Sequence, residues 1–134
     1  MDTKQQWIAL KRHYDFGDIK FNGKELIWTG KLKSSPLGDD YLVRMEYKTK
    51  GTPKVFVLEP KILNLPPKKN KLEHVYDHQK QRLCLYYPKL NEWNETKCIA
   101  YTIMPWAIEW LYHYEIWLIT DGEWKGGGIH DEKK

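Results

Sequence analysis

One stretch of this sequence combines a thiol with imidazoles, a carboxylate and aromatic rings: residues 74–93, HVYDHQKQRLCLYYPKLNEW. Cys84 lies at the centre of an apolar run in which alternating side chains predict a short strand. His74, Asp77 and His78 precede the thiol, at positions from which the chain can fold back over it. A thiol beside imidazoles and a carboxylate is typical of a cysteine nucleophile. The alternative is that Cys84 is a small buried hydrophobic residue, as free cysteines often are.

The elements that must position this stretch begin with a helix and a meander of strands. Apolar residues at helical spacing, Trp7, Leu10 and Tyr14, predict an amphipathic helix over 3–14. An Asn22-Gly23 turn then opens an antiparallel meander. Alternating apolar residues predict its strands, which cover residues 26–32, 41–48 and 54–58.

A long connection and a second helix follow the meander. Residues 60–81 are rich in Pro and Lys and are predicted to form an irregular loop, a kind of segment that is often functional. Pro105 suits the first turn of a helix. An apolar stripe over 106–118 predicts a core helix packed on the sheet, which ends at Asp121-Gly122. With the short cysteine strand, this order predicts an α+β domain with one antiparallel sheet of about four strands.

Length and charge exclude several classes of protein. At 134 residues we expect one domain over 1–122, followed by a Gly-rich, charged tail over 123–134. A net charge of +4 with scattered lysines argues against nucleic-acid binding. Two cysteines and no signal-peptide or membrane-span pattern favour the reducing cytoplasm. The sequence has neither a CxxC pair nor a cluster of metal ligands, so we expect no metal or other cofactor.

The order of these landmarks resembles a divergent ubiquitin-conjugating enzyme domain, over roughly residues 7–119. In that family a His-Pro-Asn tripeptide precedes a catalytic cysteine in an Ile/Leu-Cys-Leu context, and a Trp and a long core helix follow. Here His74 matches the tripeptide's His, Leu83-Cys84-Leu85 the cysteine motif, and Trp93 the Trp. Val75 and Tyr76 stand where the family has Pro and Asn.

The resemblance implies a role for each candidate residue. Cys84 is the nucleophile that carries a thioester, and His74 organises the loop by a hydrogen bond. Tyr76, Asp77 and His78 are candidates for orienting the incoming amine or stabilising the oxyanion; the alternative for each is a solvated loop residue. Trp93 is expected to pack against the loop rather than contact substrate.

This chain ends earlier than the family's domain and lacks its Asn. In both respects it is similar to the conjugating-enzyme-like proteins of CBASS operons (cyclic-oligonucleotide-based antiphage signalling). The segment WAIEWLYHYEIWLIT followed by GEWKGGGIH resembles that bacterial group. The resemblance implies that the C-terminus of a cGAS-like nucleotidyltransferase is carried on the cysteine and passed to an amine. Two alternatives remain: an inert adaptor with the same fold, and an unrelated basic domain that binds nucleic acid. The sequence does not determine the oligomeric state.

Two further features of the sequence have a plain and a functional interpretation. Cys98 follows the loop after Cys84, so one interpretation is a reversible disulfide between the two cysteines. We favour the alternative, that Cys98 is a small buried residue, because cytosolic disulfides are uncommon. The run Gly126-Gly127-Gly128 is interpreted as a flexible hinge rather than a conjugatable terminus.

Overall fold

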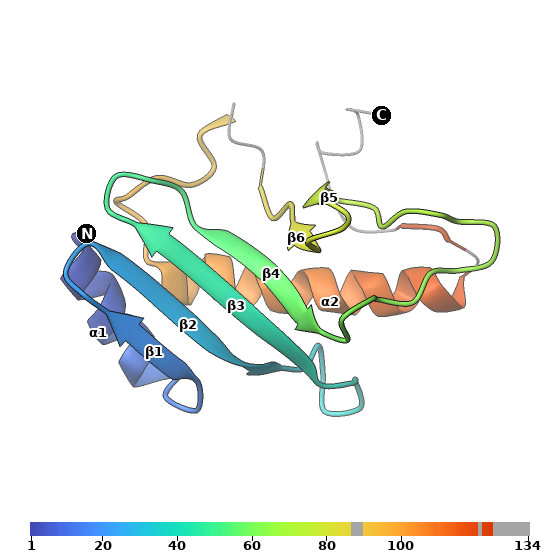
Figure 1. The fold of residues 1–134 in the computed structure, drawn as a ribbon, viewed down its shortest axis with the longest axis horizontal. Helices are drawn as coiled ribbons and strands as arrows, with labels where there is room; N and C mark the ends of the chain where they lie inside the picture. The colour runs from blue at the N-terminus through green and yellow to red at the C-terminus, as the bar shows by residue number, and fades with distance from the viewer. Residues whose placement is uncertain (87–89, 121, 125–134) are drawn as a thin grey trace.

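A long helix lies across one face of an antiparallel sheet in the computed structural model, which describes residues 1–86, 90–120 and 122–124 (Figure 1). Within these residues, six strands form the sheet in the order β1-β2-β3-β4-β6-β5, and all neighbours are antiparallel. This confirms the α+β fold class. The elements in chain order are α1 Thr3–His13, β1 Asp18–Phe21, β2 Glu25–Leu32, β3 Tyr41–Lys48, β4 Lys54–Glu59, β5 Val75–Asp77, β6 Arg82–Leu83, the 3-10 helix η2 Ile99–Tyr101 and α2 Ile103–Ile119.

Two of the six strands, β1 and β5, were not predicted. Strand β1 is a short edge strand in which no residue is fully buried, so its sequence has a weak apolar alternation. Strand β5 has three residues and lies inside the segment that was predicted to be entirely irregular. The predicted turn at Asn22-Gly23 is confirmed, because it joins β1 to β2 with Gly23 at a φ of 95°.

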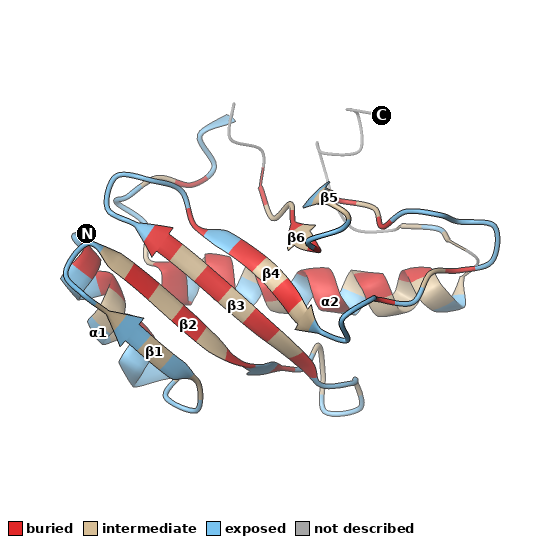
Figure 2. Ribbon diagram, viewed as in Figure 1, coloured by how far each residue is buried: buried red, intermediate tan, exposed pale blue. Residues whose placement is uncertain are grey.

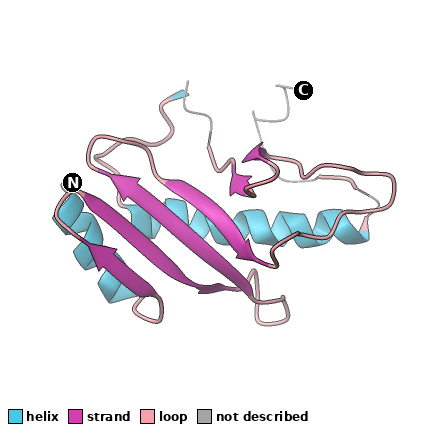
Figure 3. Ribbon diagram, in the orientation of Figure 1, coloured by secondary structure: helices cyan, strands magenta, loops and turns pink. Residues whose placement is uncertain are grey.

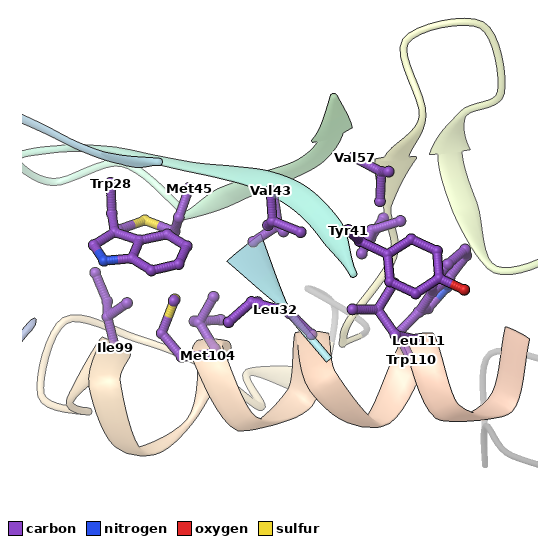
Figure 4. Close-up of a cluster of buried hydrophobic side chains, with 14 of the residues drawn as sticks. Trp28, Leu32, Tyr41, Val43, Met45, Val57, Ile99, Met104, Trp110 and Leu111 are labelled. Carbon is purple, nitrogen blue, oxygen red and sulfur yellow. The ribbon is translucent and has the colours of Figure 1, made fainter. Parts of the chain in front are cut away.

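The three central strands carry the core on the side that faces α2. Buried and more exposed residues alternate along β2, β3 and β4, and Figure 2 shows this alternation as bands. In Figure 4, Trp28 and Met45 of the sheet lie above Met104 of the helix layer. Burial of these large side chains removes apolar surface from water, which is the main stabilising contribution to such a layered fold.

Helix α2 follows the predicted apolar stripe. Its buried residues are Ile103, Met104, Ala107, Trp110, Leu111, Tyr114 and Trp117. Trp106 and Leu118 were also predicted in the stripe and are half-buried at its margins. Gly122 has a φ of 86° and donates its N–H to the carbonyl of Trp117 at 3.0 Å, as predicted for a glycine that ends a helix. Asp121 lies outside the described residues. No helix in the described part of the chain combines the length and apolar content that crossing a membrane requires.

Helix α1 is held by hydrogen bonds in its first two turns. Asp2 and Gln5 form a capping box, with the Asp2 carboxylate accepting the Gln5 N–H at 2.8 Å. The buried side chain of Gln6 donates to the carbonyl of Lys97 and accepts the N–H of Ile99, both at 2.8 Å. These two bonds join α1 to the segment that leads into η2 and α2.

The buried side chain of Gln81 holds the start of the long loop between β4 and β5. Gln81 is 4% exposed; its amide donates to the carbonyls of Val57 and Pro60, and its oxygen accepts the Leu63 N–H at 2.6 Å. Figure 3 shows this loop leaving β4 and returning as the small β5–β6 hairpin. Strand β6 pairs with β4 through Arg82 and Phe56, so the hairpin extends the central sheet. The residues that follow β6 are therefore placed by the sheet itself.

Candidate functional site

The candidate nucleophile, Cys84, directly follows the last strand of the sheet. Strand β6 ends at Leu83, so the prediction of a strand that carries Cys84 and continues to Tyr86 is wrong. The early end coincides with the end of the partner strand: β5 has only three residues, and His74 just before it has a φ of 53°, outside the β region. Tyr87, in the same predicted strand, lies outside the described residues. The thiol is half-buried rather than sealed in the core.

The backbone of His74 fixes the position of Cys84. The His74 carbonyl accepts the Cys84 N–H at 2.9 Å and the indole N–H of Trp110 at 2.9 Å. The imidazole of His74 is 8% exposed and stacks on Trp124, with ring centroids 4.8 Å apart. His74 therefore joins the cysteine to helix α2 through its carbonyl.

The hydroxyl of Tyr76 lies at the thiol. It donates to the carbonyl of Tyr86 at 2.9 Å and also forms a hydrogen bond with Cys84. The Cys84 thiol in turn lies 3.6 Å from the same Tyr86 carbonyl oxygen. The guanidinium of Arg82 covers the Tyr76 ring at 4.7 Å from its centroid. The loop's tyrosine, thiol and backbone therefore form one connected polar group.

Cys84 lines a cavity of about 420 Å³, which is within the size range of small-molecule and peptide-side-chain sites. His74 and Glu92 contribute to the loop side of this cavity, and Trp124 lines it too. The opposite wall is one face of α2, formed by Trp106, Glu109, Trp110 and His113. Cys84 therefore shares an open space with carboxylates, imidazoles and apolar rings.

Different groups around Cys84 shift the pKa of its thiol in opposite directions. Burial is the largest effect and raises the pKa of the Cys84 thiol, and the negative charge of Glu92 raises it further. Hydrogen bonds from Tyr76 and at Tyr86, and the positive charge of Arg82, lower the pKa but do not cancel the effect of burial. The thiol therefore stays protonated at neutral pH until a partner or a base changes its surroundings.

The other two polar residues predicted near the thiol contact the loop backbone. The carboxylate of Asp77 accepts the N–H of Lys80 at 2.9 Å, and Nδ1 of His78 accepts the N–H of Leu72 at 3.0 Å. Neither residue belongs to the cavity wall, whereas His74 and Cys84 do. The structure thus brings together Cys84, His74 and Tyr76, and leaves Asp77 and His78 on the outer part of the hairpin. Their predicted role toward an amine stays a prediction.

Trp93 and Cys98 lie away from the cavity. Trp93 is 5% exposed; its indole donates to the Thr102 hydroxyl at 3.0 Å, and its ring meets Tyr47 edge-on at 5.7 Å. It therefore packs against the sheet and the start of α2. Cys98 precedes η2, and its carbonyl accepts the Thr102 hydroxyl at 2.7 Å. Both cysteines are free thiols.

Four residues of the cavity wall were not singled out by the sequence analysis. They are Glu92, Glu109, His113 and Trp124. The helical members had a usable signal, because Trp106, Glu109, Trp110 and His113 recur at the three-and-four spacing of one helix face. Trp124 had no such signal, since its sequence neighbours are those of a tail. Among the described residues, no group of three or more His, Cys, Asp or Glu is placed to hold a metal ion.

The chain is similar in sequence to a known protein family. A family model described as Type II CBASS E2 protein matches residues 6–131 of the chain. The match spans α1, the sheet, the cysteine loop and α2. A search of curated proteins found no match.

Proposed function

Because the chain belongs to the Type II CBASS E2 protein family, we propose that it is a conjugating enzyme that carries an acyl group on Cys84 as a thioester and transfers it to an amine. The family gives the coarser role, E2-like conjugation in CBASS antiphage signalling. The observation that supports the finer proposal is that the Cys84 thiol lines an open cavity rather than the closed core. A thioester relay needs such a sulfur, because both donor and acceptor must reach it.

The reaction has two steps at one sulfur atom. In the first, the Cys84 thiolate attacks an activated carbonyl carbon, the carbon–sulfur bond forms and the activating group leaves. In the second, an uncharged amine attacks the thioester carbon, the nitrogen loses its proton and Cys84 leaves as a thiol. A thiolate leaves more readily than an alkoxide, so the stored acyl group stays reactive toward amines.

Residues of the loop have distinct proposed roles in these steps. The Tyr76 hydroxyl lies at the thiol, so by turning its one hydrogen from the Tyr86 carbonyl to the site it can stabilise the thiolate or the oxyanion, where the wider family uses an Asn. His74 holds Cys84 in place through its carbonyl. Asp77 and His78 remain candidates for orienting the amine, although their hydrogen bonds in this structure go to the loop backbone.

The proposed acyl donor is the C-terminus of the operon's cGAS-like nucleotidyltransferase. Support comes from the CBASS family to which the chain belongs and from the cavity, which has room for an extended chain end and an incoming amine side chain.

Co-expression with the neighbouring genes of the operon tests this proposal. Non-reducing gels are expected to show a larger species that disappears with thiol treatment. The species must be absent in Cys84→Ala, and in Cys84→Ser it must resist thiols but break in hydroxide, because an ester replaces the thioester. Cys98→Ser is the matched control, since Cys98 is a free thiol outside the cavity wall, and it must retain the species.

One observation favours an alternative, an inert adaptor with the same fold. The pKa of Cys84 is raised, so little thiolate is present at neutral pH. An adaptor would bind the nucleotidyltransferase without any covalent bond. Gel filtration and the non-reducing gels together distinguish the two functions. An adaptor forms a complex that elutes together in gel filtration, but gives no larger species on the gels with any neighbour.

A further inference from the structure

We propose that Glu109 and His113 on helix α2 form the acceptor wall of the site, with Glu109 binding the incoming ammonium group and His113 accepting its proton. This inference rests on the proposed function and adds the residues that receive the amine. It comes from the cavity, where these two side chains and the Cys84 thiol line one space.

The acceptor wall follows from the geometry of one helix face. Glu109 and His113 are four residues apart, so their side chains are neighbours on the surface of α2. Glu109 is exposed at the cavity and His113 is half-buried in it. An ammonium group entering from solvent therefore meets the carboxylate where it is accessible and the imidazole where water is partly excluded.

The chemistry of aminolysis needs both groups. A lysine amine has a pKa of about 10.4, so at neutral pH nearly all of it is protonated and cannot attack. A carboxylate attracts the charged form, and a neutral imidazole takes one of its protons, so that the nitrogen gains the lone pair with which it attacks the thioester carbon. The nitrogen–carbon bond then replaces the carbon–sulfur bond, the second proton lost by the nitrogen passes to the departing Cys84 sulfur, and His113 returns the first proton to water.

Other charged groups at the cavity are less suited to these roles. Glu92 lies on the loop side, where its charge already acts on the Cys84 thiol and raises its pKa. The His74 ring is 8% exposed and stacked on Trp124, and the Tyr86 ring is also buried. His113 also lies near Trp124, with ring centroids 6.2 Å apart. Among the described cavity residues, only His113 combines an imidazole with partial access to solvent.

A two-step kinetic experiment tests the acceptor wall. Cys84 is first acylated with a glycine-terminated peptide thioester, which exchanges its thiol for Cys84 without an activating enzyme, and the acyl group is followed by intact-protein mass. Discharge is then timed with free lysine and, separately, with hydroxylamine, an amine that is unprotonated at neutral pH. The matched controls are His13→Gln and Glu95→Gln, which change the same residue types outside the cavity wall.

The two substitutions are expected to give different kinetic signatures. His113→Gln should lower the maximal rate of discharge to lysine roughly 100-fold, the usual contribution of a general base, and leave discharge to hydroxylamine unchanged. Glu109→Gln should raise the lysine concentration needed for half-maximal rate. Normal hydroxylamine discharge from the same preparation shows that the variant is folded and acylated.

Failure of the inference and failure of the proposed function give different results. If the wild-type protein takes up no acyl group on Cys84, the proposed function fails and the acceptor wall with it. If the wild type is acylated but His113→Gln discharges to lysine at the wild-type rate, the acceptor wall alone is overturned. An equal loss toward lysine and hydroxylamine also overturns it, because the proposed role of His113 is the deprotonation before attack, which lysine needs and an amine already uncharged at neutral pH does not.

Discussion

The carbonyl oxygen of His74 accepts the backbone N–H of Cys84 at 2.9 Å, and this bond holds the candidate nucleophile at the end of β6. The same oxygen accepts the indole N–H of Trp110 from α2, also at 2.9 Å. A loop, a strand end and the core helix therefore meet at one acceptor atom. Since Trp110 also lines the cavity, the position of the thiol and the shape of its surroundings depend on one another.

Replacement of Trp110 by Phe tests this three-way junction. The ring is retained, but the His74 carbonyl loses one of its two donors at a buried position. We expect a loss of roughly 1–3 kcal/mol in the free energy of unfolding, measured by urea denaturation, and slower acylation of Cys84. Trp106→Phe is the control on the same helix; it leaves the His74 bond in place and must cost less. Equal losses in the two variants would contradict the proposed importance of the His74 carbonyl.

The reactivity of Cys84 should depend on pH in the way expected of a thiol whose pKa is raised. Burial favours the neutral form, so thiolate appears only above the range of an unperturbed cysteine, about 8.5. In a Cys98→Ser background, alkylation by iodoacetamide should therefore accelerate with a midpoint above that value. A midpoint below it, measured by the rate of mass increase, would contradict the assignment of burial as the dominant effect.

Two substitutions should move that midpoint in opposite directions. Glu92→Gln removes a negative charge that disfavours the thiolate, so the pKa falls and alkylation at pH 8 becomes faster. Tyr76→Phe removes a hydrogen bond that favours the thiolate, so the pKa rises and alkylation becomes slower. The same alkylation assay measures both. Shifts of the same sign in the two variants would show that one of these contacts has been assigned the wrong effect.

Gln81 is expected to stabilise the whole cysteine loop. The side-chain amide of Gln81 forms hydrogen bonds with the backbone of Val57, Pro60 and Leu63. These bonds join β4 to the long loop, and the Gln81 side chain is buried. Gln81→Ala leaves these backbone groups unsatisfied, and we expect a loss of about 2–4 kcal/mol on thermal or urea unfolding. Gln79→Ala, at an exposed position of the same hairpin, should change stability by less than about 0.5 kcal/mol.

Trp124 should contribute to the stability of the site although it follows α2. Its ring stacks on His74 and lies near Trp110, with centroids 4.8 and 5.4 Å away. Trp124→Ala is expected to cost roughly 1–3 kcal/mol, below the roughly 3–5 kcal/mol of a fully buried Trp. Trp124→Phe keeps a stacking ring and should recover most of that loss in the same unfolding measurement.

The parts of the fold that were predictable are those with a regular apolar period. Strand β3 and the core stripe of α2 have strong alternation and three-four spacing, because their burial depends mainly on one neighbouring layer. The α1 start at Thr3 and the cap at Gly122 follow from local hydrogen bonding that the residues themselves provide. These features need no knowledge of distant contacts.

The site was less predictable because it is made by contacts between segments far apart in the chain. Cys84 was proposed as the nucleophile from its sequence neighbours and stays a prediction, whereas the end of β6 before Cys84 depends on pairing with the short strand β5. The cavity wall from α2 depends on which helix face meets the loop. Glu109, His113 and Trp124 acquire a place at the site only when the helix is docked, and their local sequence does not encode that docking.

The most direct test of the account is the mass of the protein after incubation with a glycine-terminated peptide thioester, followed by peptide mapping. We predict one added acyl group, located on Cys84, released by hydroxylamine at neutral pH and absent in Cys84→Ala, while Cys98→Ser is acylated as fully as the wild type. An acyl group located on Cys98, or no acylation of folded wild-type protein at a pH where iodoacetamide alkylates Cys84, would contradict the central claim.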